Sequence, residues 1–402
     1  MMIPDTVSGH KVTKRGVHLS PSGHHGFWLE NADYWVELMQ SMGISWALTL
    51  SDSDGAIIKH TCAGNRSAVQ VLLDGGIIPV VRFLPSNLPR HFNQQDHVVT
   101  LVGQCEPYGV TPIVQWPNEP GDGREWVKDV PDNWLDIFLE RWQEFAGLVI
   151  ERGAIAGFPD GPCYDEDPFP RIQSTWPWWE DGKCIYLGHH YALNRPVDYP
   201  YDAIQREGLQ WTKADLEESL GDFYHNPDYN DVPLDVMNRA RIEYMDPCLT
   251  AVEDPTCWRG WEQIEYWMIL NFGKVLPMAL TEGGQTPGAR AGGGATAEIR
   301  YPKPTPDNVA DFTLGMFEAD TPMLFQTPWL LADGDMGGPD SWPYDSWHTW
   351  AFEDLYGRLK PVIQMLQDNP PSGNPTVEQK LVEAQAHIAS ADDALDRILT
   401  LL

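Results

Sequence analysis

The sequence contains no long apolar run, and this limits the surroundings in which the protein is expected. No stretch approaches the roughly 20 apolar residues that a membrane-spanning helix needs. The opening residues MMIPDTVSGHKVTKRG also lack the apolar core of a signal peptide. We therefore expect no membrane partner, and either a cytoplasmic protein or a secreted protein whose leader has been removed.

Basic residues are scarce. The chain has 27 Lys and Arg against 58 Asp and Glu, which gives a net charge of −31. Nucleic-acid binding requires clustered Lys and Arg beside the phosphates, and the sequence has no such cluster. The charge favours neutral or cationic partners. Adaptation of the surface to salt or to low pH explains the same acidity equally well.

Cysteines are few, which excludes a small disulfide-stapled scaffold. The chain has six in 402 residues, and none forms a Cys-x-x-Cys pair. Cys248 and Cys257 flank a short loop, so they are the candidates for a disulfide. Buried free thiols are the favoured interpretation of the other four. The redox compartment stays open.

What the sequence does contain is a regular alternation of short apolar runs and longer helical patterns. Runs that are apolar throughout are typical of parallel strands covered on both faces of a sheet. The eight runs are 17-VHLS, 44-ISWALTL, 77-IIPVVRF, 110-VTPIVQW, 154-AIAGF, 184-CIYLGHH, 276-LPMALT and 323-MLFQTPWLL.

Amphipathic helices are predicted between these runs. The clearest spans 132–153, where Asp132 is a candidate N-cap and Gly153 a candidate end, with buried positions three and four residues apart. Similar patterns occupy 31–43, 65–76 and 307–320. Eight strand–helix repeats predict an α/β fold, a (β/α)8 TIM barrel, whose chemistry lies at the C-terminal ends of the strands.

Two regions depart from the repeat of the predicted catalytic domain, 1–368. An acidic insertion at 192–256 follows the sixth strand, where a barrel would place it beside the mouth as a lid or a subsite wall. After the linker 369–375, a helix over 376–402 has apolar residues in a heptad pattern. It either forms a coiled coil in a homo-oligomer or packs its stripe on its own barrel.

Two of the apolar strands end on a glutamate, Glu119 after the fourth strand and Glu282 after the seventh. These strands face each other across a barrel mouth. Two carboxyl groups about 5 to 5.5 Å apart can cleave a glycosidic bond with retention of configuration, one as nucleophile and the other as acid and base. The pair therefore predicts a glycosidase site, which needs neither a metal ion nor an organic cofactor.

The motifs around these glutamates resemble those of the clan A retaining glycoside hydrolases, TIM-barrel enzymes that include families 5 and 39. An Asn-Glu pair ends the fourth strand in those enzymes, as 118-NEP does here, and a glutamate ends the seventh, as in 281-TEGG. The resemblance implies that Glu119 is the acid/base and Glu282 the nucleophile. It covers about residues 15–365.

The resemblance also implies substrate-binding residues. Asn118 would bond the 2-hydroxyl of the sugar, and Arg82 would bond the nucleophile, although a purely structural salt bridge is the alternative for Arg82. His189 and Tyr191 match a His-x-Tyr sequence at the end of the sixth strand, and Trp329 would form the floor of the sugar site.

Tryptophans outside the helical patterns are further candidates for stacking on sugar rings, namely Trp116, Trp178 and Trp179. Several such residues favour a cleft with more than one sugar subsite, hence an endo-acting glycosidase on an oligo- or polysaccharide. The alternatives are an exo-acting β-glycosidase, if the insertion closes one end of the cleft, and a non-catalytic sugar-binding protein on a glycosidase-like barrel.

Overall fold

The computed structural model describes residues 3–19, 32–59, 61–62, 65–160, 166–221, 225, 232–285, 298–328 and 361–371. The chain divides into two units, Met1–Asp368 and Asn369–Leu402, and the fold below is that of the first. The helix predicted over 376–402 lies outside the described residues.

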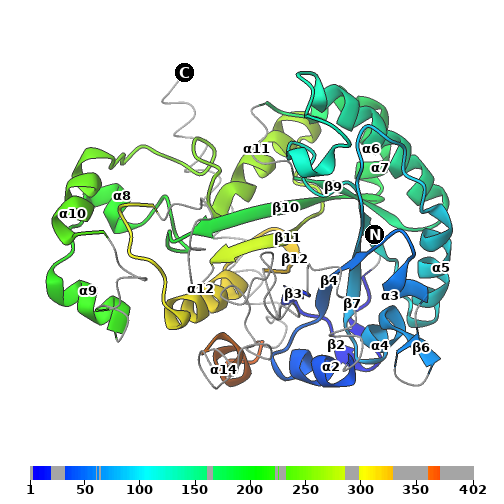
Figure 1. Ribbon diagram of the computed structural model, residues 1–402, viewed down its shortest axis with the longest axis horizontal. Coiled ribbons are helices and arrows are strands. Elements are labelled where there is room, and N and C mark those ends of the chain that lie inside the picture. The colour runs from blue at the N-terminus through cyan, green and yellow to red at the C-terminus, as the bar shows by residue number, and fades with distance from the viewer. Residues whose placement is uncertain are drawn as a thin grey trace. The chain divides into compact units, whose positions relative to one another are not determined.

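A parallel sheet of eight strands forms the centre of the molecule (Figure 1). Neighbours in the sheet are consecutive along the barrel repeat, in the order β12-β11-β10-β9-β8-β7-β4-β3. The first and last strands also meet, because Arg15 bridges Gln326 in parallel and the Gln326 amide donates to the carbonyl of Lys14 at 3.0 Å. The sheet is thereby closed into a barrel. Its strands are β3 (Gly16–His18), β4 (Trp46–Ser51), β7 (Ile78–Phe83), β8 (Ile113–Gln115), β9 (Ile155–Pro159), β10 (Cys184–Leu193), β11 (Met278–Gln285) and β12 (Met323–Gln326).

Helices follow the strands and cover the outside of the barrel. They are α2 (Ala32–Ser41), α3 (Ala56–Lys59) and α4 (Ala68–Asp74), α5 (Gln95–Cys105), α6 (Trp134–Glu151), α7 (Trp176–Glu180), α11 (Trp261–Phe272), α12 (Pro306–Glu318) and α14 (Pro361–Asp368). Short 3₁₀ segments join them at Glu106–Tyr108, Gly123–Glu125, Phe169–Thr175 and Trp258–Gly260. Two small hairpins lie outside the barrel, β1 (Thr6–Val7) with β2 (His10–Lys11) and β5 (Thr61–Cys62) with β6 (Arg66–Ser67).

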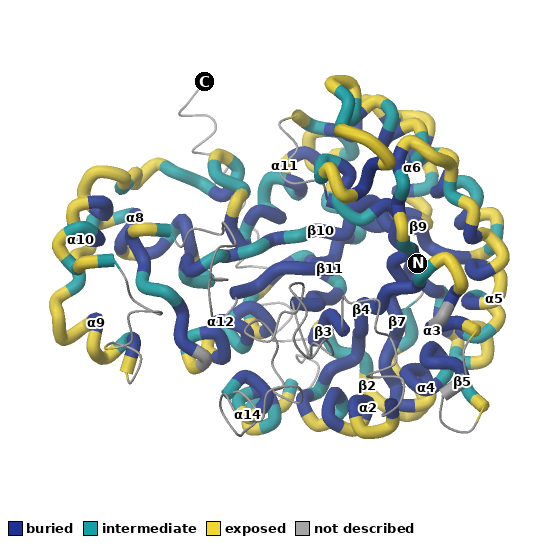
Figure 2. The backbone as a smooth tube through the Cα atoms, viewed as in Figure 1, coloured by how far each residue is buried: buried dark blue, intermediate teal, exposed yellow. Residues whose placement is uncertain are grey.

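The predicted (β/α)8 barrel is therefore confirmed, and each of the eight apolar runs overlaps one barrel strand. Figure 2 shows the reason for their composition: the strands are buried along most of their length, and exposed residues lie on the outer sides of the helices. A strand with the barrel interior on one face and helices on the other has no side that favours polar residues.

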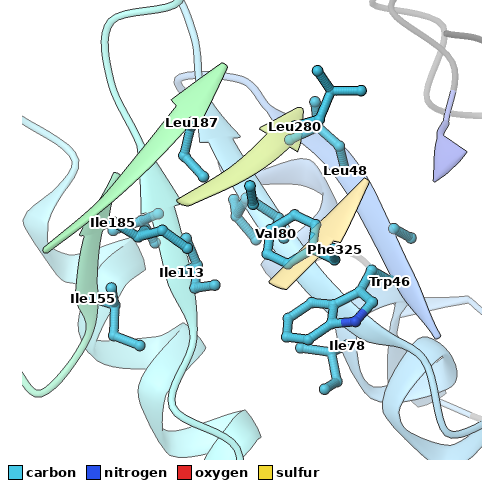
Figure 3. Packing of buried hydrophobic residues seen from close by; sticks show 14 of the residues in the cluster. Trp46, Leu48, Ile78, Val80, Ile113, Ile155, Ile185, Leu187, Leu280 and Phe325 are labelled. Carbon is cyan, nitrogen blue, oxygen red and sulfur yellow. The ribbon is translucent and has the colours of Figure 1, made fainter. Parts of the chain in front are cut away.

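The barrel interior is filled by apolar side chains from successive strands (Figure 3). Trp46 and Phe325 stack there with ring centroids 4.3 Å apart, and this contact joins β4 to β12. Ile78, Val80 and Ile113 point into the same space. This packing closes the barrel below the strand ends, as side-chain layers do in this fold.

Several helices begin at side chains that cap the backbone. Ser67 forms a reciprocal capping box with Gln70 at the start of α4, and Thr305 forms one with Asn308 at the start of α12. The prediction for α6 was wrong in this detail, because its N-cap is Asn133 rather than Asp132 and makes no side-chain capping bond. The buried stripe of α6, which includes Phe138 and Trp142, positions the helix instead.

The described part of the insertion after β10 folds into three helices, α8 (Ala203–Glu207), α9 (Lys213–Leu220) and α10 (Leu234–Glu243). The arrows of β10 and β11 point toward it in Figure 1. It is tied to the barrel at the strand ends, where the Gln285 side chain donates to the carbonyl of Arg195 at 3.2 Å. The insertion therefore lies beside the C-terminal ends of these two strands, and no task follows from its contacts.

The candidate disulfide is not formed, since Cys248 and Cys257 are both free thiols. Cys248 is exposed, whereas Cys257 is buried in the small core of the insertion. Within the described ranges, no helix has both the length and the apolar character needed to cross a membrane.

Candidate active site

The candidate site residues lie at the C-terminal ends of the barrel strands. Alternation along β7 puts Arg82 on the same side as Ile78 and Val80, which point into the barrel. His189 follows Leu187 in the same way on β10. The apolar stripe that fills the barrel interior is thus continued by polar residues at the mouth.

A register shift between β10 and β11 brings His189 and Glu282 side by side. Leu187 is paired with Ala279, yet His189, two residues later, is paired with Glu282. Thr281 is the extra residue of this bulge. Without the shift, Thr281 would lie opposite His189 and Glu282 would face the other side of the sheet, because a slip of one residue reverses the side-chain direction.

The glycine after Glu282 is required by the close approach of the two strands. Gly283 has a φ of +138°, and a Cβ at this position would lie 2.3 Å from the carbonyl oxygen of His190. Only a residue without a side chain fits there. The Glu-Gly-Gly sequence therefore reflects the geometry that carries Glu282 past β10.

Glu282 is buried and held on both oxygens. Arg82 donates to Oε1, and the Tyr191 hydroxyl donates to Oε2 at 2.5 Å. His18 faces Oε1 with Nε2 at 3.7 Å. Burial by itself raises the pKa of Glu282, but Arg82, His189, His18 and the Tyr191 hydroxyl outweigh it and hold the pKa well below its usual value. The side chain is therefore an anion at any working pH.

Glu119 has different surroundings. Its Oε1 lies 2.9 Å from Nδ1 of His189, and its Oε2 lies 3.2 Å from a terminal nitrogen of Arg124. Carboxylate oxygens of Glu119 and Glu282 lie within 4.8 Å of one another. The two carboxyl groups thus face a common space, one enclosed by the barrel and the other at its rim.

The hydrogen bonds of His189 assign its tautomer. Arg82 can only donate, and its Nη2 lies 3.0 Å from Nε2, so Nε2 is the acceptor and Nδ1 carries the proton that is donated to Glu119. Burial by itself lowers the pKa of His189, but Glu282 and Glu119 outweigh it and raise the pKa. Acidification therefore places a second N–H against Arg82 and disrupts this arrangement.

Glu119, His189 and Glu282 present ligand atoms within 4.8 Å of one another, which raises the question of a metal ion. The tautomer argues against one, because Nδ1 of His189 directs a proton rather than a lone pair toward the two carboxylates. Arg82 also supplies a positive charge in contact with Glu282. These residues do not fit a metal site.

Asn118 is positioned by two groups beneath it. Its backbone amide lies 3.3 Å from the Ser86 hydroxyl and 3.4 Å from a carboxylate oxygen of Glu125. Burial raises the pKa of Glu125. The side-chain oxygen of Asn118 is buried and has no hydrogen-bond partner among the described residues.

No protein-family model matches the sequence, and no curated protein matches it at a significant level. Several solved structures are similar. A family 39 glycoside hydrolase from Bacteroides cellulosilyticus is 15% identical, with 91% of this chain and 65% of that chain covered and a TM-score of 0.43. β-Glucuronidase 2 of Bacteroides uniformis is 12% identical, with 80% and 31% covered and a TM-score of 0.42. The endoglucanase Cel5A of Pseudomonas stutzeri is 10% identical, with 89% and 94% covered and a TM-score of 0.44.

The chain spans less than two thirds of the family 39 enzyme, at 65%, and of the β-glucuronidase, at 31%. The chemistry that this site can perform therefore follows from its own side chains.

The tryptophans predicted to stack on sugars do not lie at the mouth. Trp116 is 1% exposed and packs against Phe92 and Phe145, and Trp179 is fully buried beside Trp142. Trp178 is half-buried in α7, which leads into the N-terminal end of β10, opposite the mouth. These predictions were wrong because flat aromatic rings fill the layer between sheet and helices equally well. Trp329 lies outside the described residues.

Four polar residues at the mouth were missed by the sequence analysis. They are His18 at the end of β3, Asp160 directly after β9, and Arg124 and Glu125 in the loop after β8. The strand-end rule that singled out Glu119 and Glu282 would also have found His18 and Asp160. Burial lowers the pKa of His18 to about 4, so this ring is neutral beside Glu282.

Asp160 is a buried carboxyl group that faces no arginine or lysine within hydrogen-bond distance among the described residues. Its Oδ2 accepts from the backbone amide of His189 at 3.3 Å and lies 3.9 Å from Nδ1 of His190. Burial raises the pKa of Asp160 to about 7. The folded protein therefore keeps this proton over a range in which the unfolded chain has released it.

We expect Asp160→Asn to reduce the dependence of stability on pH. Between about pH 4 and pH 7 the folded state binds more protons at Asp160 than the unfolded state, so the contribution of Asp160 to the free energy of unfolding falls as the pH rises. The amide cannot ionise but still accepts from His189. Urea unfolding measures the free energy of unfolding at pH 5 and at pH 8. The loss of this free energy between pH 5 and pH 8 should be smaller in the variant than in the wild type by about 2 kcal/mol.

The exposed Asp181, which pairs with Lys183, supplies the control. In Asp181→Asn the free energy of unfolding should change between pH 5 and pH 8 by as much as in the wild type. An equal pH dependence in the wild type and in Asp160→Asn would remove Asp160 from this account.

Proposed function

We propose that the protein is a retaining glycosidase that cleaves β-linked glycans through a covalent glycosyl-enzyme intermediate. The observation that carries this proposal is the pair Glu119 and Glu282, whose oxygens lie within 4.8 Å of one another. Retaining glycosidases need carboxyl groups about 5 to 5.5 Å apart, whereas inverting ones leave about 6.5 to 9.5 Å for a water molecule. The spacing supports retention.

The surroundings of the two glutamates suit two different tasks. Glu282 is kept anionic by Arg82 and by the Tyr191 hydroxyl, as a nucleophile must be. Glu119 is half-buried at the rim, where it can exchange a proton with a leaving group and with water. Environments that separate two carboxyl groups in this way assign acid and nucleophile.

In the first step a Glu282 oxygen attacks the anomeric carbon while the bond to the leaving oxygen breaks. Glu119 gives its proton to that oxygen and becomes a carboxylate. His189, which donates to Glu119 at 2.9 Å, stabilises the charge that develops there. Tyr191 remains a phenol, because burial and the two carboxylates raise its pKa, so it keeps its hydrogen bond to Glu282.

In the second step a water molecule attacks the same carbon from the face that the leaving group has vacated. Glu119 accepts a proton from this water, and the ester bond to Glu282 breaks. Arg82 and Tyr191 receive the returning carboxylate in the arrangement seen here. Asn118 offers its free oxygen to the 2-hydroxyl of the bound sugar, a contact that strengthens in the transition state of such enzymes.

A screen of p-nitrophenyl β-glycosides of common hexoses and pentoses, together with β-linked oligosaccharides, should identify the sugar that the protein cleaves. Because Trp116, Trp178 and Trp179 lie away from the mouth, they no longer favour endo action. Product length decides it: an endo-acting enzyme releases oligosaccharides first, and an exo-acting enzyme releases single sugars from the start. Binding without turnover on every substrate would favour the sugar-binding alternative.

We expect the first product to have the β configuration. Proton NMR spectra recorded during hydrolysis should show the β-anomer before mutarotation produces the α-anomer, because two displacements at one carbon restore its configuration. A reaction in heat-inactivated protein provides the baseline. Early appearance of the α-anomer would contradict the retaining mechanism.

A further inference from the structure

The acid/base candidate Glu119 has an arginine as a neighbour that no mechanistic step has yet used. The guanidinium of Arg124 lies 3.2 Å from Oε2 of Glu119. The Arg124 side chain is 73% exposed, whereas that of Glu119 is 18% exposed. The contact therefore joins a residue on the solvent side of the rim to the carboxyl group that would handle protons.

Asp122 holds Arg124 in this position. Nε of Arg124 lies 3.0 Å from each oxygen of Asp122, and a terminal nitrogen lies 2.7 Å from Oδ2. Asp122 also caps the 3₁₀ turn by accepting from the Arg124 amide at 2.7 Å. A guanidinium held by several bonds to one carboxylate has a defined direction despite its exposure.

The loop that carries these residues is itself fixed to the barrel. The Trp126 indole donates to the carbonyl of Pro120 at 2.8 Å, and the Leu88 amide donates to the carbonyl of Glu125 at 2.7 Å. Glu119 and Arg124 therefore sit on one closed loop, pinned to the segment after β7. Their separation is a property of the fold.

We propose that Arg124 is a positioning residue that sets the proton affinity of Glu119 by favouring its carboxylate form. This inference rests on the proposed function. When Glu119 gives its proton to the leaving oxygen, the negative charge that remains is stabilised by the adjacent guanidinium. The same cation makes Glu119 a weaker base in the second step, so Arg124 favours cleavage over hydrolysis of the intermediate.

Other titratable and charged groups also influence the proton affinity of Glu119. His189 donates to it from β10, Tyr191 lies on the same strand, Glu282 faces it from β11, and Asp160 faces it from the end of β9. Most of these groups change protonation with pH or are shared with Glu282. Arg124 contributes a charge that stays constant over the working range.

The first test is a direct titration that needs no substrate. Carbon-13 NMR of protein labelled at the glutamate carboxyl carbons follows Glu119, whose signal is identified by its loss in Glu119→Gln. In Arg124→Ala the midpoint should move up by about half a pH unit, the size expected of an ion pair with one exposed partner. In Arg124→Lys, which keeps the charge, the midpoint should return most of the way to that of the wild type.

A surface arginine elsewhere supplies the control. Arg171 pairs with Asp136 and Glu166 and with neither glutamate of the site, so Arg171→Ala removes the same charge from the protein without removing a partner of Glu119. In Arg171→Ala the titration midpoint of Glu119 should equal that of the wild type. An unchanged midpoint in Arg124→Ala, or an equal shift in both variants, would overturn the inference.

The second test separates this inference from the proposed function. The alkaline limb of kcat/KM should shift upward in Arg124→Ala by the same amount as the NMR midpoint, measured on the oligosaccharide that the wild type cleaves best. A shifted midpoint with an unshifted alkaline limb would keep Arg124 as the residue that positions Glu119 and would reject Glu119 as the acid. Equal shifts in both measurements support both assignments.

Discussion

Replacing Glu282 with glutamine is expected to reduce kcat by roughly 10⁴-fold or more, because an amide cannot form the glycosyl ester. The side chain has the same length, and its one amide oxygen can still accept from either Arg82 or Tyr191, so the sugar should bind. Initial rates on the best p-nitrophenyl β-glycoside measure the loss. Activity above about one per cent of the wild type would exclude Glu282 as the nucleophile.

Stability has to be measured alongside, since Glu282 balances the charge of Arg82, which is 2% exposed. Removing one partner of a buried ion pair typically costs about 3 kcal/mol, so Glu282→Gln should melt at a lower temperature. Glu282→Asp is the matched control, because it keeps the charge but withdraws the oxygen by one methylene group. A variant that keeps its stability and still loses activity ties the loss to the chemistry.

Replacing Glu119 with alanine is expected to slow hydrolysis of oligosaccharides by about 10²- to 10⁴-fold, as loss of a general acid does. Substrates with a good leaving group, such as 2,4-dinitrophenyl β-glycosides, still form the intermediate but hydrolyse it slowly. Azide should then accelerate turnover, because this small anion attacks without help from a base and fits where the carboxylate was. The product should be the β-glycosyl azide.

Glu140, an exposed glutamate on α6, supplies the control. Glu140→Ala should behave as the wild type and show no response to azide. Wild-type rates in Glu119→Ala, or azide products of the α configuration, would assign the acid/base role to another group.

The apolar runs and their spacing determined the fold. A parallel strand covered on both faces has no polar side, so eight short apolar runs between amphipathic helices predicted a (β/α)8 barrel, which the structure confirms. Asp132 as the cap of α6 was wrong, and the candidate pair Cys248 and Cys257 is not bonded, because local spacing does not show which side chain reaches a backbone group or a second thiol.

The position of the two glutamates was also predictable, because strand ends of a closed barrel meet at one mouth. The sequence therefore brought Glu119 and Glu282 together as candidates, with Arg82, His189 and Tyr191 added by resemblance. Tryptophans were the weakest part of the prediction. The side chains of Trp116 and Trp179 are of the kind that stacks on sugar rings, yet they are buried in the core.

By itself, then, the sequence determined the strand ends, because periodicity and apolar character depend on neighbours along the chain. Only the tertiary structure decided that a bulge at Thr281 turns Glu282 toward His189, and that Arg82 keeps the buried Glu282 ionised. It alone also placed Arg124 beside Glu119 and buried Asp160 deeply enough to raise its pKa. These features depend on distances across the barrel and on exclusion of water, which arise only when strands far apart in the chain are packed together.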